Sequence, residues 1–280
     1  MIFSLIMATY GRYSEIDRFL ESLTKQEISA RDFEVIIVDQ NDKIDLSEIV
    51  EKYINCLNVR HIKSSRKGLS RNRNIGLEVA RGEYVCFPDD DCTYYPDTLS
   101  TVLKHFQATD AFGIFGAIRN RNERRNIIRN WPYFDKILSR SNFFMLYSSI
   151  TVFARNSELR FDERLGVGEY FGSCEDTDYV YDMIVSHGDC RYFSDVEVWH
   201  PPLNIHIMGD AKNFSYGLGF GAFCAKRARD PFVLRLFFMS LCYHTLFAFV
   251  ALLKLDKRAA LLRKGAFLSR VRGFREYIKS

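Results

Sequence analysis

Several patterns that define protein classes are missing from this sequence of 280 residues. Its seven cysteines are dispersed and none forms a CxxC pair, which argues against a disulfide framework or a zinc ribbon and fits a reducing compartment. Proline occurs 6 times and glycine 16 times, without an internal repeat or a low-complexity linker. Hydrophobic residues make up 47% and charged residues 26%. This composition excludes a collagen-like or intrinsically disordered chain and supplies a full core.

The N-terminus also lacks the basic n-region and the small-residue cleavage site of a signal peptide. Its short apolar run, residues 1–7, is therefore expected to be a strand. The net charge is only +4, but residues 225–280 carry 13 Lys and Arg against 3 Asp and Glu. This net charge of +10 leaves −6 on the first 224 residues. The asymmetry indicates that the C-terminal segment meets something anionic, either a membrane surface or a nucleic acid.

The C-terminal segment contains one long apolar run. Residues 236–253 include no Asp, Glu, Lys or Arg, and 18 residues just reach the length of a spanning helix. Ser240, His244 and Thr245 nevertheless share one side at helical spacing, and many cations follow. We expect in-plane attachment to an anionic cytoplasmic leaflet. A spanning helix and a helical subdomain with a basic face remain alternatives.

The first third of the chain alternates between strand and helix patterns. Strands are expected at 2–7, 33–39, 59–62 and 83–87, and helices at 14–23, 46–54, 70–80 and 96–106. This alternation predicts βαβ units and a mainly parallel sheet, whose ligands bind at the carboxyl ends of the strands. In the less regular middle, we expect an exposed segment at 119–129, a strand at 145–153, a helix at 175–186, and extended segments at 189–193 and 196–199.

The residues with the clearest chemistry fall at the predicted strand ends. Asp89, Asp90 and Asp91 follow a hydrophobic strand directly. Adjacent carboxylates repel one another unless a cation lies between them, and a hard divalent ion holding a diphosphate would meet that need. A solvated acidic turn would explain the same three residues. Likewise, Asp39 is either a ligand for a base or ribose or an ordinary turn residue, and His200 is either a metal ligand or a structural histidine.

Five motifs in order resemble the family-2 glycosyltransferases, which have the GT-A fold. The segments are Ala8–Arg12 (with Gly11 where the family usually has Asn), Val38–Asp42, Gly68–Gly76, Gly82–Asp91 with a DXD-like end, and Glu175–Asp176. The resemblance covers about residues 2–205. It implies a Rossmann-like α/β sheet, with a GT-A domain at 1–205 and a helical, basic C-terminal segment at 206–280.

The resemblance also implies roles for individual residues. Thr9, Arg12 and Asp39 would hold the nucleotide, with Arg71 and Asn72 near the nucleotide or diphosphate. Asp89 and Asp90 would contact the cofactor, and the ligands of Mg²⁺ or Mn²⁺ would be Asp91, Asp89 and His200, with Asp90 as an alternative register. Asp176 would deprotonate the acceptor hydroxyl, and a single base opposite the leaving group predicts inversion.

The expected function is therefore sugar transfer from a nucleotide sugar to a saccharide acceptor on a lipid carrier, in bacterial surface polysaccharide synthesis. The enzyme would lie on the inner face of the cytoplasmic membrane. Two alternatives are a nucleotidyltransferase of similar fold and a non-catalytic nucleic-acid-binding protein that uses its basic tail. The single glycine after the first strand disfavours the former, and the acidic first 224 residues disfavour the latter. The aromatic residues Trp131, Tyr170 and Phe171 could stack on acceptor sugars or pack in a core.

Overall fold

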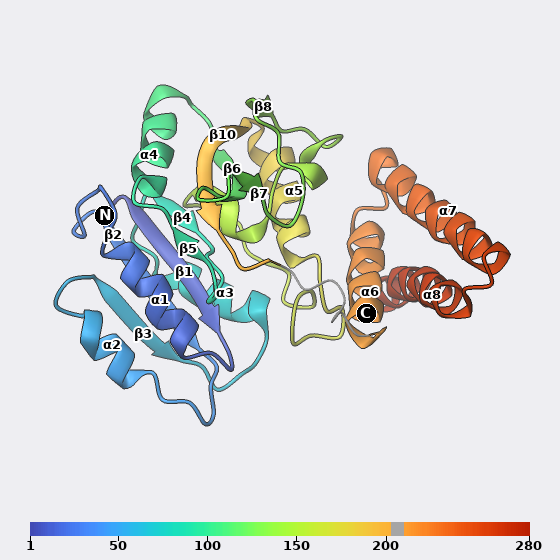
Figure 1. Ribbon diagram of the computed structural model, residues 1–280, viewed down its shortest axis with the longest axis horizontal. Coiled ribbons are helices and arrows are strands. Elements are labelled where there is room, and N and C mark those ends of the chain that lie inside the picture. Colours follow the sequence, from blue (N-terminus) through green and yellow to red (C-terminus); the bar gives the residue numbers. More distant parts are fainter. Residues whose placement is uncertain (203–209) are drawn as a thin grey trace. The chain divides into compact units, whose positions relative to one another are not determined.

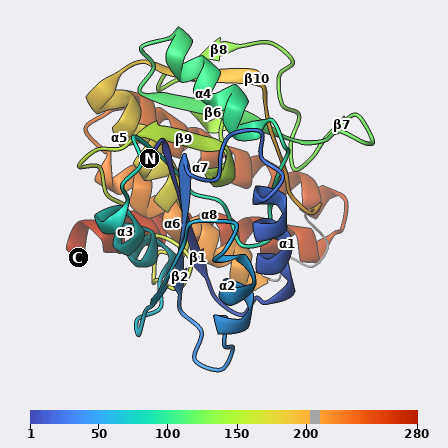
Figure 2. The same cartoon turned by 90° about the vertical axis from the view of Figure 1, so that its left-hand side faces the viewer.

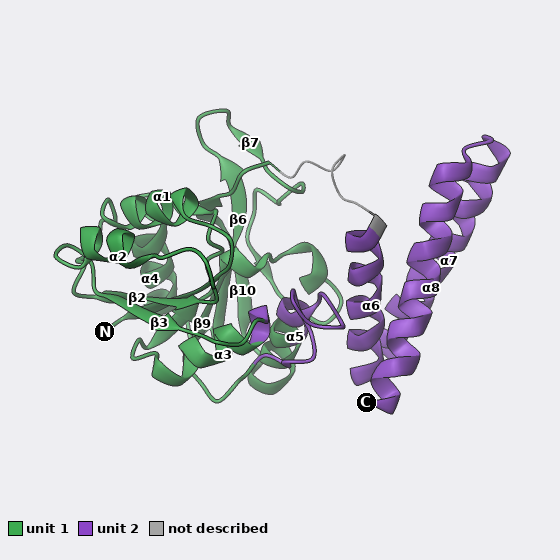
Figure 3. Ribbon diagram, turned by 90° about the horizontal axis from the view of Figure 1, so that it is seen from below, with its two compact units in different colours: residues 1–67, 71–160, 179–203 green, residues 68–70, 161–178, 204–280 purple. Residues whose placement is uncertain are grey.

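The computed structural model describes residues 1–202 and 210–280, which form two compact units (Figure 3). Among the described residues, unit 1 comprises 1–67, 71–160 and 179–202, and unit 2 comprises 68–70, 161–178 and 210–280. The domain boundary expected between residues 205 and 206 lies outside the described residues, so that division stays a prediction. All seven cysteines are free thiols.

Unit 1 is built on a mixed sheet with helices on both faces (Figure 1). Its first half has the strand order β3-β2-β1-β4 and is parallel throughout. These strands are β1 (Phe3–Thr9), β2 (Phe33–Asp39), β3 (Val59–Lys63) and β4 (Tyr84–Cys86), and the helices between them are α1 (Ser14–Leu23), α2 (Ser47–Tyr53) and α3 (Leu69–Val79). Figure 2 shows α1 and α3 on opposite sides of β1 and β2. Because both faces are covered, β1 and β2 are buried along almost their whole length and mainly apolar, rather than alternating between buried and exposed residues.

The second half of the sheet is mixed. The order continues β9-β6-β10-β5, with β9 antiparallel to both β4 and β6. The elements are β5 (Thr93–Tyr94), α4 (Thr98–Ala108), β6 (Gly113–Asn120), β7 (Arg125–Asn126), β8 (Lys136–Ile137), β9 (Val152–Arg155), α5 (Glu175–His187) and β10 (Cys190–Trp199). The two extended segments expected at 189–193 and 196–199 are one strand, β10, whose register against β6 shifts between Tyr192 and Glu197. The prediction of a mainly parallel sheet therefore holds for the first half only.

One prediction for the middle of the chain is wrong, and another holds only in part, since residues 122–125 are exposed as expected. Residues 145–153 are not one strand: the 3₁₀ turns Phe143–Met145 and Ser149–Thr151 precede β9. Ser148 and Thr151 cap the second turn reciprocally, and this local hydrogen bonding outweighs the apolar composition. Residues 119–129 are not simply an exposed segment either, because Arg119 is buried in β6.

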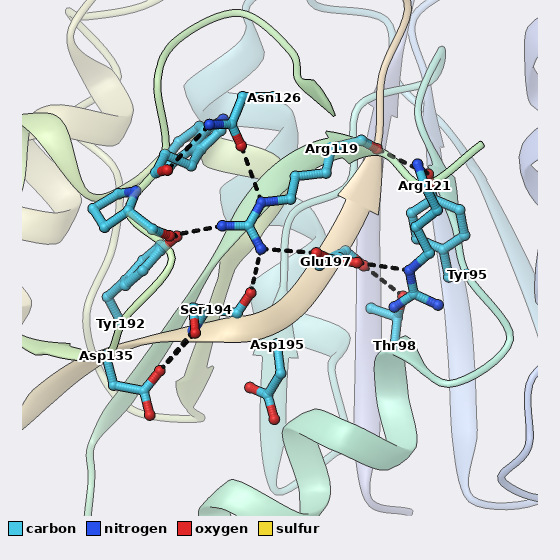
Figure 4. A network of polar contacts seen from close by, with 12 residues as sticks. Tyr95, Thr98, Arg119, Arg121, Asn126, Asp135, Tyr192, Ser194, Asp195 and Glu197 are labelled. Atoms are coloured by element: carbon cyan, nitrogen blue, oxygen red, sulfur yellow. Dashed lines mark hydrogen bonds and ion pairs between the residues drawn. The ribbon is translucent and has the colours of Figure 1, made fainter. Parts of the chain in front are cut away.

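Arg119 is buried because it satisfies backbone groups where the chain is irregular (Figure 4). Its guanidinium donates to the carbonyl of Ser194 (2.6 Å), inside the register shift of β10, and to the carbonyl of Pro132 (2.7 Å). It also pairs with Glu197 at 2.8 Å, and Glu197 binds Arg121 at 2.7 Å. The network holds the irregular part of β10, the strand that leads to His200, in place.

Unit 2 contains three long helices: α6 (Asp210–Lys226), α7 (Pro231–Leu253) and α8 (Lys257–Lys279). Asp230 caps α7 ahead of Pro231, and Asp256 caps α8. A core of buried apolar side chains joins α6 and α8 to the segment 161–178; its members are Leu165, Phe171, Leu218, Ala222, Ala225 and Tyr277. By length and composition, α7 is the one helix among the described residues that could cross a membrane.

Helices α6 and α8 approach each other closely through small residues. A Cβ added at Gly273 of α8 would lie 2.1 Å from the carbonyl oxygen of Leu218, and one added at Gly221 of α6 would lie 2.1 Å from that of Arg270. Gly217 meets the side chain of the fully buried Ser269 in the same way. The two pairs of small residues, each four positions apart, allow backbone-to-backbone packing.

This close packing predicts opposite effects for the same substitution at two positions of α8. Gly273→Ala should lower the free energy of unfolding by about 1–3 kcal/mol, because the added methyl group overlaps the backbone of α6. Gly265→Ala should raise it by about 0.5–1 kcal/mol, because that position faces open space and gains only helix propensity. Urea denaturation of both variants measures the difference. Equal effects at the two positions would contradict the described α6–α8 packing.

Candidate active site

The carboxyl ends of β1, β2 and β4 bring most of the predicted site residues of unit 1 together. Thr9 and Asp39 are register partners at the ends of β1 and β2. The Thr9 hydroxyl donates a 2.7 Å hydrogen bond to Oδ2 of Asp90, in the segment that follows β4. The polar cluster therefore arises where apolar parallel strands end, as the sequence predicts.

Asp91 lies between two cationic partners. Nη2 of Arg12 is 3.1 Å from Oδ2 of Asp91, and Nε2 of His200 is 3.2 Å from Oδ1. Arg12 also reaches Asp90 at 3.8 Å. His200 follows β10, and its Nδ1 donates to the carbonyl of Pro201 at 2.6 Å. This bond orients Nε2 toward Asp91.

These contacts separate the proton affinities of two neighbouring carboxylates. Burial, together with the charges of Asp91 and Asp89, raises the pKa of Asp90 to about 6. The hydrogen bond from His200 lowers the pKa of Asp91, although burial opposes the shift. Burial also opposes protonation of His200, but its interactions with Asp91 outweigh burial and raise its pKa. Of these two neighbours, Asp91 is thus the one held as an anion and Asp90 the one that binds a proton more readily.

Asp39 is fully buried and already has several protein partners. Its Oδ1 accepts two hydrogen bonds of 2.8 Å from Asn41, and its Oδ2 contacts His61 at 2.9 Å and Lys63 at 2.7 Å. Despite the opposing effect of burial, the hydrogen bonds from Lys63, Asn41 and His61 lower the pKa of Asp39. A nucleobase or ribose would have to replace the half-exposed Lys63 to reach this carboxylate.

The first turn of α3 contributes one contact that the sequence did not reveal. Arg73, only 1% exposed, pairs with Asp89 at 3.1 Å. The predicted Arg71 is partly exposed, whereas Asn72 is buried and donates to the carbonyl of Arg66 at 3.0 Å. Arg73 belongs to the predicted motif, but no role is assigned to it. The sequence alone does not show whether Arg71 or Arg73 points into the protein.

The side chains at this edge fit a divalent cation in part. Asp91 and His200 already lie next to each other, and their carboxylate and imidazole are suitable donors for Mn²⁺. Asp89 is directed to Arg73 instead, and no group of three or more His, Cys, Asp or Glu in the described chain is arranged to hold a metal. Such ions commonly keep waters and bind substrate phosphates with only one or two carboxylates, so two protein ligands are compatible with the site.

Asp176, the predicted base, belongs to unit 2 and lies in the first turn of α5. Its Oδ1 accepts a 2.7 Å hydrogen bond from the backbone of Thr177, and its side chain is partly exposed. The preceding loop is anchored on α6, since Ser173 donates to the carbonyl of Tyr216 at 3.1 Å. Cys174 has φ +68°, a left-handed conformation that non-glycine residues adopt rarely.

A buried ionic network that the sequence did not reveal also fixes this segment. Lys226 bridges two carboxylates, Asp178 at 2.6 Å and Asp162 at 2.9 Å. Asp178 also forms an ion pair with Arg227 at 2.6 Å. Asp162 accepts a 2.7 Å hydrogen bond from the hydroxyl of Tyr277. Asp178 is only two residues from Asp176, so α6 and α8 hold the helix start that carries the predicted base.

Comparison with known proteins decides the family. The protein-family model described as "Glycosyl transferase family 2" matches residues 4–161, which is more than half of the chain. The chain belongs to glycosyl transferase family 2. Over 101 residues it is 38% identical to the "Poly(ribitol-phosphate) beta-N-acetylglucosaminyltransferase TarS" of Staphylococcus aureus. That match covers 35% of this chain and 18% of TarS, so it spans less than a fifth of the relative.

Solved structures confirm the predicted GT-A fold for this family-2 glycosyl transferase. A crystal structure of S. aureus TarS in complex with UDP-GlcNAc has a TM-score of 0.62 at 19% identity, covering 100% of this chain and 92% of that one. The mannosyltransferase PcManGT from Pyrobaculum calidifontis, in complex with GDP-Man and Mn²⁺, has a TM-score of 0.64 at 15% identity. That match covers 98% of this chain and 87% of the PcManGT chain.

Gly11 departs from the family-2 pattern for a visible reason. Its φ is +77°, and its backbone N–H donates to the side chain of Asn41 at 2.6 Å. Glycine and asparagine are the residues that enter this left-handed region most readily. Glycine therefore suits the turn that leads to Arg12.

Two of the three aromatic candidates for acceptor stacking are core residues. Trp131 is 2% exposed and donates to the carbonyl of Ile127 at 3.0 Å, and Phe171 lies in the core of unit 2. Tyr170 is half exposed and its hydroxyl donates to Glu276. Of the three candidates, Tyr170 is the one with a substantially exposed side chain.

The ionic network predicts a large stability effect for Lys226. Lys226→Met should lower the free energy of unfolding by about 1–3 kcal/mol, because Asp162 and Asp178 lose a shared cation while Arg227 and Tyr277 stay in place. The same change at Lys25, whose pair with Glu21 is exposed, should cost less than about 1 kcal/mol. Chemical denaturation compares the two variants. A similar small loss in both would mean that the network does not stabilise unit 2.

Proposed function

We propose that this family-2 glycosyltransferase is an inverting, metal-dependent enzyme. It transfers a sugar from a nucleotide sugar to a hydroxyl of a lipid-linked saccharide, in bacterial surface polysaccharide synthesis. The observation that carries this proposal is the meeting of Thr9, Arg12, Asp90, Asp91 and His200 at the carboxyl ends of the parallel strands. The relative TarS, named as a poly(ribitol-phosphate) N-acetylglucosaminyltransferase, supports the surface-polymer setting.

The donor would bind at this edge of unit 1. Asp91 and His200, with Asp89 or Asp90, would hold Mg²⁺ or Mn²⁺, and the cation would stabilise the charge on the leaving diphosphate. Arg12, Arg71 and Asn72 supply positive charge and hydrogen-bond donors for phosphate oxygens. Thr9 fixes the carboxylate of Asp90, and Asp39 would accept a hydrogen bond from the base or ribose.

Asp176 would be the general base for the acceptor hydroxyl. Its partly exposed carboxylate is in the first turn of α5. The ion pairs of Asp178 hold that turn in place. A single base that activates the acceptor on the face opposite the leaving group gives inversion at the anomeric carbon.

Helices α7 and α8 support a peripheral position on the inner face of the cytoplasmic membrane. Only 17% of the most apolar stretch of α7 is buried, and its exposed side chains include Phe238, Met239, Leu246, Phe249 and Leu253. Exposed apolar surface on this scale marks an interaction site. The polar side of α7 is turned to α8, since Ser240 accepts a 2.8 Å hydrogen bond from Arg270. An apolar face with cations nearby suits in-plane attachment to an anionic surface.

The donor assay is the central test. Nucleotide release from a panel of nucleotide sugars should require Mn²⁺ or Mg²⁺ and stop with EDTA. Asp91→Ala should lose metal-dependent donor binding, because Asp91 lies beside His200 and is the main proposed metal ligand. Asp176→Asn should keep donor binding but lose turnover by at least about a hundredfold, as for removal of a general base.

Calorimetric donor binding and turnover are measured separately on each variant. Asp110→Asn is a matched control, because Asp110 is an exposed aspartate of unit 1 outside the five motifs. Absence of binding to any nucleotide sugar by the folded protein with metal present would contradict the proposal. Turnover that persists in EDTA would contradict its metal requirement alone.

Membrane attachment has its own test in vesicle co-sedimentation. The full chain should bind phosphatidylglycerol vesicles better than phosphatidylcholine vesicles, and less well at 1 M salt, where the Debye length falls to about 3 Å. Phe249→Asp should weaken binding by about tenfold or more, because it removes one buried apolar side chain from the interface. Met145→Asp, at an equally exposed apolar position of unit 1, should not. Binding that ignores salt and lipid charge would contradict in-plane attachment.

A further inference from the structure

A groove lies between α7 and α8 of unit 2. Its volume is about 740 Å³, within the range of roughly 300–1,000 Å³ that is typical of ligand pockets. The walls are mainly apolar and include Ala248 and Leu252 from α7 and Leu261 and Phe267 from α8. Leu252 and Leu261 are more than half exposed, so the groove opens onto the apolar surface of the hairpin. Such a groove suits a hydrocarbon chain.

Three cations line the same groove: Lys257, Arg263 and Lys264. No carboxylate belongs to its lining, and none of the three forms an ion pair within the described parts of the chain. The guanidinium of Arg263 lies over the rings of Tyr243 and Phe247, 5.2 and 5.5 Å from their centroids. Aromatic faces position this cation without neutralising it, which leaves its charge available to an anion.

His244 is a second, independent indication of a ligand. Its imidazole lines the groove, is only 7% exposed, and has no hydrogen-bond partner for Nδ1 among the residues that the structure describes. Burial, with the charges of Arg270 and Arg263, lowers the pKa of His244 to about 4, so the ring is neutral at pH 7. A buried polar atom without a partner costs about 1–3 kcal/mol, a cost that a polar ligand group would remove.

We infer that the α7–α8 groove binds one lipid molecule, with its hydrocarbon chain between the helices and its phosphate headgroup at Lys257, Arg263 and Lys264. Charge complementarity selects this occupant, since a neutral lipid or a second apolar helix would leave three cations and His244 without partners. The inference deepens the proposed function, because such a lipid is the class of molecule that would carry the saccharide acceptor. Binding itself requires no sugar transfer, so it is measured separately.

The test uses the purified full chain and dodecyl phosphate below its critical micelle concentration. Dodecyl maltoside provides the same chain with a neutral head, and inorganic phosphate provides the head alone. Native mass spectrometry gives both the number of ligand molecules bound to each chain and the number of chains in the particle. A titration with each ligand gives its affinity. We expect one dodecyl phosphate per chain, bound at least tenfold more tightly than dodecyl maltoside, and no saturable binding of phosphate alone.

Variants locate the site. Ala248→Trp fills the groove and should weaken dodecyl phosphate binding at least tenfold, whereas Phe249→Trp, an exposed position outside the lining, should not change it. Lys264→Gln should weaken binding by about fivefold, as expected for one charge near a phosphate. Lys254→Gln, an exposed lysine outside the groove, is its control. Circular dichroism and donor binding show whether each variant is folded.

Three results would overturn the inference. These are equal affinity for the charged and neutral heads, full binding by Ala248→Trp, or a dimer that Ala248→Trp separates without any loss of lipid binding. The last would assign the groove to a second copy of the chain. Each result leaves metal-dependent donor turnover unaffected. Conversely, loss of donor turnover with intact lipid binding would reject the proposed function and keep the groove as a lipid site.

Discussion

The arrangement of unit 1 depends on how three consecutive carboxylates are compensated at the end of one buried strand. Asp89, Asp90 and Asp91 follow β4, and each carboxylate has its own partner. Asp89 pairs with Arg73, and Asp90 accepts a hydrogen bond from the Thr9 hydroxyl. Asp91 contacts both Arg12 and His200. The partners come from four separate elements of the chain. Because these partners converge at one edge of the sheet, they offset there the mutual repulsion of the carboxylates.

A second set of charges organises unit 2. Lys226 lies between Asp162 and Asp178, which links the end of α6 to both ends of the segment 161–178. Tyr277 adds α8 to the same network. Buried ion pairs contribute little net stability over apolar residues, but they define geometry strictly, because any misplacement leaves a charge without a partner. The helices that meet the proposed membrane surface therefore also position the turn that contains Asp176.

The regular first third was predictable because local patterns and tertiary burial agree there. The expected strand at 33–39 coincides with β2, and the motif residues Thr9, Asp91 and His200 do meet at the strand ends. The middle was not predictable for the opposite reason. Arg119 is buried by carbonyl groups from Pro132 and Ser194, far away in sequence, and no local pattern distinguishes it from an exposed arginine. The ionic network around Lys226 escaped prediction in the same way, since its members are up to 115 residues apart.

The glycines between α6 and α8 have a consequence for how this molecule can change. Gly221 and Gly273 have backbone atoms where a side chain would be, so these positions admit a single residue type. The contact between α6 and α8 consequently tolerates few substitutions, whereas the outward face of α7 has no position that requires glycine. Sequence drift can then alter the length and apolarity of α7 without disturbing the frame beneath it. Replacement of α7 alone is a route by which the proposed membrane attachment of this transferase could change.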